Sequence, residues 1–206
     1  MPHIELPLEI PGIASAFAFR PETAKPMREL AHVLLFEPGS DASLSSRDRE
    51  LIATYVSSRN TCYFCQTSHG AAAASHPGGS SELVAAVCAD PQTADISDKL
   101  KALLVIAARV QSDAKTVTPE MVSTARAAGA TDLEIHDTVL IAAAFCMYNR
   151  YVDGLATWQP RNEEMYRVMG KRLAESGYTQ TPAAHPPVTK PIADQPVIAE
   201  SAIAAR

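Results

Sequence analysis

The chain has 206 residues, of which 47% are hydrophobic and 20% charged, so it carries enough apolar side chains for one buried core. Its formal net charge of −5 and its lack of a basic run argue against nucleic acid or an anionic membrane as a partner. The N-terminus does not resemble a secretory signal, and the longest apolar stretch, 139–148, is much shorter than the ~20 residues of a membrane span. We therefore expect a cytoplasmic protein.

The first part of the chain predicts an arm followed by helices. Residues 1–20 are interrupted by prolines, and we expect them to form an extended N-terminal arm. Apolar residues at a spacing of three to four then predict a helix from Glu22 to the break at Pro38-Gly39. Ser45, followed three residues later by Asp48, is typical of a capping box and predicts the start of a second helix.

A third helix is predicted to begin at Cys62, with Thr61 as its N-cap, and to end at the turn formed by residues 76–79. Later helices are predicted over 81–89 and 98–110, from Thr118-Pro119 to Gly129, from a Thr131/Glu134 capping box to Gly154 or beyond, and over 162–176. Alternating β-branched runs are nearly absent, so the predicted class is all-α.

The composition divides the chain into three segments. We expect a helical domain over 21–178 between the N-terminal arm and a tail that is rich in proline and alanine, 179–206. Two interpretations of the tail remain open: it is disordered, or it lies as an extended arm across a neighbouring subunit.

Two cysteines and a histidine share the predicted third helix. At about 100° per residue, Cys65 lies about 60° and His69 about 20° from Cys62, so all three side chains occupy one narrow face. Phe64 is expected to point the other way. A cysteine in a first helical turn is stabilised as a thiolate by the helix dipole and by unpaired N–H groups, which can lower its pKa to ~3.5–7.5.

The same residues predict redox chemistry. His69 follows Cys65 by one turn and can exchange a proton with it, and Glu50 on the preceding helix is the candidate to orient the imidazole. A peroxide would oxidise one thiol to a sulfenic acid, the second thiol would condense with it to a disulfide, and an external dithiol would reduce the pair.

The spacing Glu50, twelve residues, Cys62-x-x-Cys65 and then His69 resembles the AhpD-like alkylhydroperoxidases of the carboxymuconolactone decarboxylase superfamily. The segments 19–23, 49–52, 128–135 and 149–155 further resemble the branch known as peroxidase-related enzymes, and the likeness covers roughly 12–170. Members of the best-described branch of the family carry a histidine between the cysteines, where this chain has Phe64.

The resemblance implies an AhpD-like helical bundle that forms homo-oligomers (dimers, trimers or hexamers) and reduces hydroperoxides without haem, flavin or metal. By position, Cys65 would attack the peroxide and Cys62 would be the resolving and more exposed thiol, with His69 and Glu50 as the proton relay. The reductant would be a thioredoxin-like or lipoyl protein. Two alternatives use the same cysteine pair: a non-catalytic redox sensor, and a helical interaction protein stabilised by zinc.

Overall fold

The computed structural model describes residues 1–37, 39 and 44–180, and within them every regular element is helical. The elements are α1 (Ile13–Phe19), α2 (Pro21–Leu35), α3 (Ser46–Arg59), α4 (Tyr63–Ser75), α5 (Ser81–Ala89), α6 (Asp98–Asp113), the short 3-10 helix η1 (Ala114–Thr116), α7 (Pro119–Ala127), α8 (Asp132–Gly154) and α9 (Glu163–Ser176). The all-α class predicted from the sequence is therefore confirmed.

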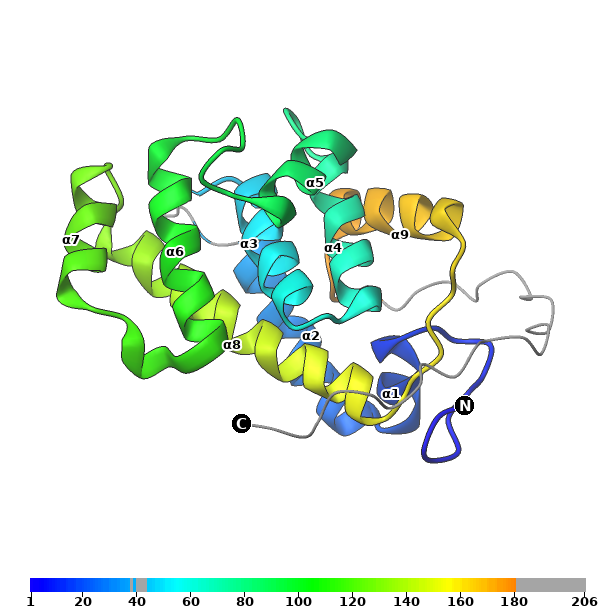
Figure 1. Ribbon diagram of the computed structural model, residues 1–206. Coiled ribbons are helices and arrows are strands. Elements are labelled where there is room, and N and C mark those ends of the chain that lie inside the picture. The colour runs from blue at the N-terminus through cyan, green and yellow to red at the C-terminus, as the bar shows by residue number, and fades with distance from the viewer. Residues whose placement is uncertain (38, 40–43, 181–206) are drawn as a thin grey trace, which may run out of the picture.

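Helix α3 lies in the middle of the bundle and packs against α2, α4, α5, α6 and α8. The long helix α8 runs across the molecule, with α6 and α7 at one end and α1 and α9 toward the other (Figure 1). Helices α4 and α9 lie side by side, and Gly170 allows their close approach because a Cβ there would lie 2.4 Å from the carbonyl carbon of Ala71. The two cysteines of the Cys-x-x-Cys motif thus lie on a segment held between α3 and α9.

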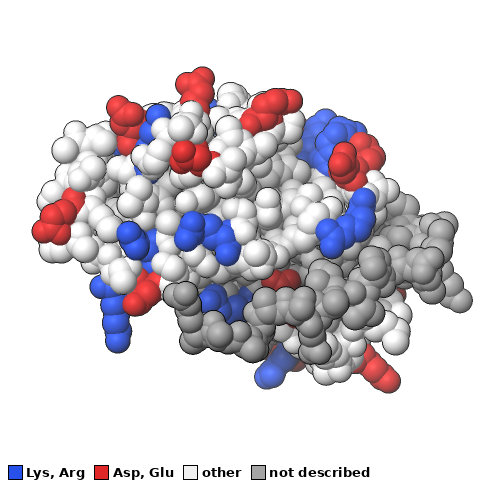
Figure 2. All heavy atoms as spheres, in the orientation of Figure 1, with Lys and Arg blue, Asp and Glu red and all other residues white. Residues whose placement is uncertain are grey.

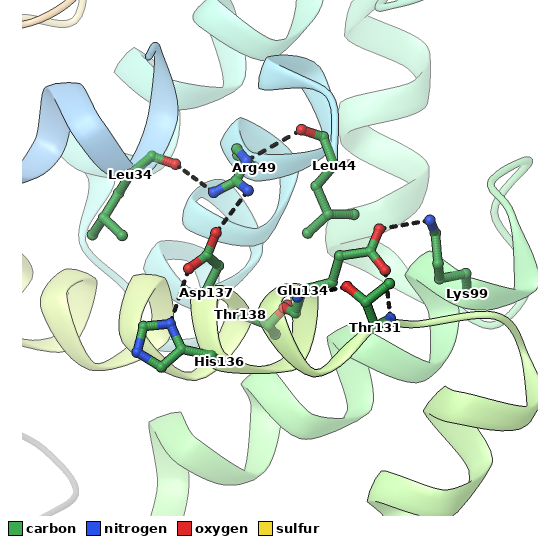
Figure 3. A network of polar contacts seen from close by, with 9 residues as sticks. All are labelled: Leu34, Leu44, Arg49, Lys99, Thr131, Glu134, His136, Asp137 and Thr138. Carbon is green, nitrogen blue, oxygen red and sulfur yellow. Dashed lines mark hydrogen bonds and ion pairs between the residues drawn. The ribbon is translucent and has the colours of Figure 1, made fainter. Parts of the chain in front are cut away.

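Side-chain caps begin most of the helices. The predicted capping box at α8 is confirmed: the Glu134 N–H donates to Thr131 Oγ1 at 3.2 Å, and the Thr131 N–H donates to Glu134 Oε2 at 2.7 Å. Lys99 also donates to Glu134, at 2.6 Å (Figure 3). At α3, the Asp48 N–H donates to the Ser45 hydroxyl, as a capping box requires. The Asp48 carboxylate accepts from the Arg47 guanidinium, so only the first half of the predicted box is seen.

The N-terminal segment corrects one prediction. Instead of a wholly extended arm over 1–20, residues Ile13–Phe19 form α1, and Leu6 and Phe17 are buried. The apolar residues of this segment cover one side of α2 and α8, which is why they fold onto the bundle despite the prolines. Of the predicted tail, 179–206, residues 181–206 lie outside the described part of the chain.

A buried arginine joins three helices of the bundle. Arg49 on α3 is fully buried, and its guanidinium donates to Leu34 O at 3.0 Å, to Leu44 O at 3.2 Å and to Asp137 Oδ2 at 2.7 Å (Figure 3). His136 in turn contacts the other oxygen of Asp137, at 3.0 Å. Because a buried charge is tolerated only with partners at each donor, this network fixes α3 relative to α2 and α8.

The surface agrees with the small negative net charge. On the face shown in Figure 2, acidic and basic side chains are interspersed among neutral ones, without a continuous basic field over the described atoms. Among the described residues, no helix has both the length and the apolar character needed to cross a membrane.

Candidate functional site

Helix α4 begins one residue later than predicted. Cys62 is its N-cap, with an extended backbone (φ −80°, ψ 96°), and Tyr63 is its first helical residue. Thr61, the expected N-cap, instead adopts a left-handed conformation with φ 57°, which is unusual for a β-branched residue. The turn lets the Cys62 N–H bond to Ser57 O at 3.1 Å. As a result Cys65, rather than Cys62, lies in the first helical turn.

The two thiols differ in their surroundings. The resemblance implied that Cys62 is the more exposed of the two, and the structure shows otherwise. Cys62 has an exposed fraction of 0% and Cys65 one of 4%, so the expectation that Cys62 is the more exposed thiol is wrong. Cys62 is enclosed by a small apolar cluster that includes Val152 and Tyr166, at the junction of α4, α8 and α9. Cys65 borders a cavity.

The Cys62 thiol keeps its proton. A hydrogen bond with the Cys65 side chain, and then burial, raise the pKa of the Cys62 thiol well above its ordinary value. This shift is opposite in sign to the lowering that the sequence predicted for a thiol at this helix start. Both cysteines are free thiols in the structure. The geometry is that of a protonated Cys62 adjacent to the Cys65 sulfur.

The carboxylate of Glu50 reaches His69, as the spacing of the two residues predicts. Glu50 lies on α3 with an exposed fraction of 1%, and its Oε2 is 2.8 Å from Nδ1 of His69 on α4. The imidazole is packed edge-on against the ring of Phe145, with centroids 4.6 Å apart. A carboxylate at Nδ1 favours the tautomer with its proton on that nitrogen, which leaves Nε2 as an acceptor.

Tyr178 also contacts Glu50 and His69, and the sequence did not identify it as a site residue. The hydroxyl of Tyr178 donates to Oε1 of Glu50 and lies 3.3 Å from Nδ1 of His69, and the tyrosine ring stacks on the imidazole at 5.8 Å. Burial, and then the Glu50 carboxylate, raise the pKa of Tyr178 well above its ordinary value, so its hydroxyl stays protonated as a donor. Its only sequence signal is a glycine-tyrosine pair directly after the last predicted helix.

The position of Tyr178 depends on its neighbour, Gly177. Gly177 ends α9 with φ 67°, in the left-handed region, and a Cβ there would lie 2.4 Å from Nδ1 of His32. The Tyr178 N–H donates to the same His32 nitrogen at 3.2 Å. This turn carries the chain back over α2 and α4 and places the tyrosine ring against His69.

The cavity beside Cys65 has a volume of about 120 Å³. Its reactive wall comes from α4, and α1, α2, α8 and α9 supply the rest. The α4 residues that line it are Phe64, Cys65, Ser68 and His69. The remaining walls are largely apolar and include Ile13, Phe17, Met27, Phe145, Met169 and Leu173, together with Arg28 and Arg172. The cavity thus brings a thiol and an imidazole to one partly open, mainly apolar space.

The prediction that Phe64 points away from the two thiols is wrong. Phe64 forms part of the cavity wall together with Cys65. Its ring packs against Tyr166 with centroids 5.9 Å apart. The prediction failed because α9 and α1 close over this side of α4, so a wider arc of the helix faces the cavity than one narrow stripe. The Tyr166 hydroxyl is buried and has no hydrogen-bond partner among the described residues.

Metal ligation finds little support in the same region. Within the described part of the chain, no group of three or more His, Cys, Asp or Glu side chains is placed to hold a metal ion. The zinc-stabilised alternative would need four ligands, and the cysteine pair with His69 supplies at most three, of which His69 is committed to Glu50.

Three solved structures share this fold. An uncharacterized peroxidase-related protein from Silicibacter sp. TM1040 is 25% identical, with a TM-score of 0.67 over 77% of this chain and 79% of that one. A peroxidase-related protein from Ralstonia eutropha JMP134, described as an alkylhydroperoxidase AhpD core, is 23% identical, with a TM-score of 0.68 over 79% and 82%. ATU0492 from Agrobacterium tumefaciens, described as a putative antioxidant defence protein AhpD, is 22% identical, with a TM-score of 0.62 over 76% and 100%.

These likenesses, together with the helical bundle around a Cys-x-x-Cys pair, define the class as AhpD-like. The sequence model of the Carboxymuconolactone decarboxylase family matches residues 21–107, which include Glu50, both cysteines and His69. The family model and the solved structures together support the AhpD-like and carboxymuconolactone decarboxylase superfamily as the one this chain resembles. No curated protein matches the sequence.

Proposed function

We propose that the protein is a thiol-dependent peroxidase that reduces hydroperoxides through Cys65 and Cys62. The observation that carries the proposal is the cavity that Cys65 and His69 line together, with Glu50 bound to the far nitrogen of the imidazole. A nucleophile, a base and a residue that orients the base are the parts of an activated nucleophile. The superfamily supports a peroxidase-related activity, and the site supports the thiol chemistry.

In the first step, His69 takes the proton of the Cys65 thiol through Nε2, directly or through a water. The thiolate then attacks the terminal oxygen of the hydroperoxide and the O–O bond breaks. His69 returns the proton to the departing alkoxide. The products are an alcohol and a sulfenic acid on Cys65. The protonated Cys62 thiol assists, because it donates a hydrogen bond to the Cys65 sulfur.

In the second step, the Cys62 sulfur attacks the Cys65 sulfenic acid. The S–O bond breaks, the hydroxyl leaves with the proton of Cys62 as water, and a disulfide forms. The N-cap position of Cys62 keeps the two sulfurs in contact without unwinding the helix. An external dithiol, for which a thioredoxin-like or lipoyl protein is the proposed source, then attacks the disulfide and restores both thiols.

The test is single-turnover oxidation of the reduced protein by a hydroperoxide, followed by thiol counting and by turnover with a supplied dithiol. Cys65→Ser should abolish peroxide consumption, and Cys62→Ser should allow one oxidation that stops at sulfenic acid. Cys88→Ser is the matched control, because Cys88 lies on α5 and does not line this cavity. Undiminished turnover in Cys65→Ser would refute the assignment.

A redox sensor is the second candidate, and the burial of both sulfurs favours it. Cys62 and Cys65 are 0% and 4% exposed as thiols, so a disulfide formed between them must become accessible before a bulky reductant can attack it. The sensor predicts that peroxide forms the disulfide once, and that dithiol regeneration is far slower than oxidation. Sustained multiple turnover with a protein dithiol would favour the peroxidase instead. The proposed homo-oligomer can be measured in both redox states in the same experiment.

A further inference from the structure

Two arginines line the same cavity as Cys65 and His69. Arg28 comes from α2 and Arg172 from α9, and each is half-buried. Neither guanidinium forms an ion pair with a carboxylate of the described residues, although Arg28 lies 5.1 Å over the ring of Phe17. A cation–π contact of this kind leaves the positive charge uncompensated.

Burying the two arginine charges without a carboxylate partner is energetically unfavourable. Burial and the charge of Arg172 both lower the pKa of Arg28, and burial lowers the pKa of Arg172. The buried Arg49, by contrast, is compensated by Asp137 and two carbonyl groups. Two like charges that line one cavity without a counter-ion form a site for an anion, because an anion between them relieves both the repulsion and the desolvation.

The rest of the cavity limits the ligand to a small, partly apolar molecule. Its volume of about 120 Å³ is similar to that of engineered apolar cavities, ~150 Å³, which accept one benzene molecule. Ile13, Met169 and Leu173 supply hydrocarbon surface to the same cavity. Tyr178, whose hydroxyl donates to Glu50, lines the same cavity as Arg172 and His69.

We propose that Arg28 and Arg172 bind the carboxylate of a small organic hydroperoxide, so that the preferred substrates are hydroperoxides of short carboxylic acids. The planar guanidinium forks match a carboxylate, and the apolar walls take the carbon skeleton. The hydroperoxy group is then directed toward Cys65. This assignment rests on the proposed peroxidase function and adds the substrate class.

The experiment compares two hydroperoxides that differ by one carboxylate. We expect kcat/KM for 3-hydroperoxy-3-methylbutanoate to exceed that for tert-butyl hydroperoxide by about tenfold or more, because a charge-assisted contact in a partly exposed site is worth about that factor. Arg28→Met and Arg172→Met keep an unbranched apolar side chain and remove the charge. Each should lower kcat/KM for the carboxylate substrate about tenfold and change the neutral one by less than about threefold. Arg167→Met is the matched control, because Arg167 lies exposed on α9 in an ion pair with Glu164.

A binding measurement separates this inference from the proposed function. The alcohol product 3-hydroxy-3-methylbutanoate needs no chemistry, and its uncharged amide is a control of the same shape. Titration calorimetry should show binding of the carboxylate, little binding of the amide, and loss of carboxylate binding in both arginine variants. If neither hydroperoxide is reduced but this binding pattern holds, the peroxidase proposal fails and the carboxylate site stands. If both hydroperoxides are reduced equally well, or a preference survives in both variants, the carboxylate site is overturned and the peroxidase proposal stands.

Discussion

The hydroxyl of Tyr178 donates to the buried carboxylate of Glu50, although 128 residues separate the two in the chain. Glu50 therefore has one partner on each oxygen, Tyr178 on Oε1 and His69 on Oε2. A carboxylate that is held at both oxygens cannot rotate, so the imidazole of His69 is fixed relative to the cavity. The last described segment of the chain thereby becomes part of the candidate site.

Replacing Tyr178 by phenylalanine keeps the stacked ring and removes the donor. We expect the rate of Cys65 oxidation to fall about tenfold, because Glu50 would lose one of its two partners and hold His69 less firmly. Stopped-flow thiol oxidation measures the rate. Tyr151→Phe, on α8 and outside the cavity lining, serves as the control and should match the wild type. An unchanged rate in Tyr178→Phe would remove the tyrosine from the relay.

The turn at Gly177 offers an independent way to displace the same ring. Gly177→Ala places a Cβ in contact with His32 at a backbone φ of 67°, which disfavours side chains by about 1 kcal/mol or more. We expect a loss of oxidation rate like that of Tyr178→Phe, and no further loss when both changes are combined. Gly154→Ala is the control, because a Cβ added at Gly154 would have no neighbour within 4 Å and the φ of this residue is not positive. Additive losses would show that the two residues act separately.

The ion pair of Arg49 with Asp137 supports the fold rather than the chemistry. Arg49→Leu leaves Asp137 buried without its main partner, and breaking such a pair typically costs about 3–5 kcal/mol in free energy of unfolding. Urea denaturation measures that loss. The double variant Arg49→Leu/Asp137→Leu should lose less than the sum of the single changes, because no unpaired charge remains buried. Strict additivity would contradict the pairing.

Alkaline pH should destabilise the protein through its buried tyrosines. Burial raises the pKa of Tyr148 to about 12, from an ordinary value near 10. The unfolded chain then loses this proton before the folded one does, so the stability contribution is complete below pH 10 and is lost as the pH rises from 10 to 12. The slope for one such group is about 1.4 kcal/mol per pH unit. Unfolding free energies measured between pH 9 and 11 should fall less steeply in Tyr148→Phe than in the wild type, and equal slopes would contradict the shift.

The two cysteines should differ in their reaction with an alkylating agent. The reduced protein, treated with iodoacetamide near pH 7 and mapped by mass spectrometry, should be modified at Cys65 before Cys62. Cys62 is fully buried and keeps its proton, whereas Cys65 borders the cavity. Faster labelling of Cys62 would reverse the order of roles proposed for the pair.

Local pattern was sufficient for most of the helical architecture. The Thr131 cap, the helix over Ser81–Ala89 and the helix after Pro119 follow from capping and periodicity, which act within a few residues. The pairing of Glu50 with His69 was also expected, from the spacing of a known motif. The start of α4 was displaced by one residue, because Thr61 enters a left-handed turn that no propensity predicts.

What the sequence determined by itself is therefore most of the helices, and the cysteine pair with its histidine at the start of one of them. Only the tertiary structure decided that Tyr178 donates to Glu50, that Arg28 and Arg172 line the cavity beside Cys65, and that Cys62 is buried. The physical reason is range: helix periodicity and caps are set by neighbours along the chain, whereas burial and charge pairing depend on which helices pack together.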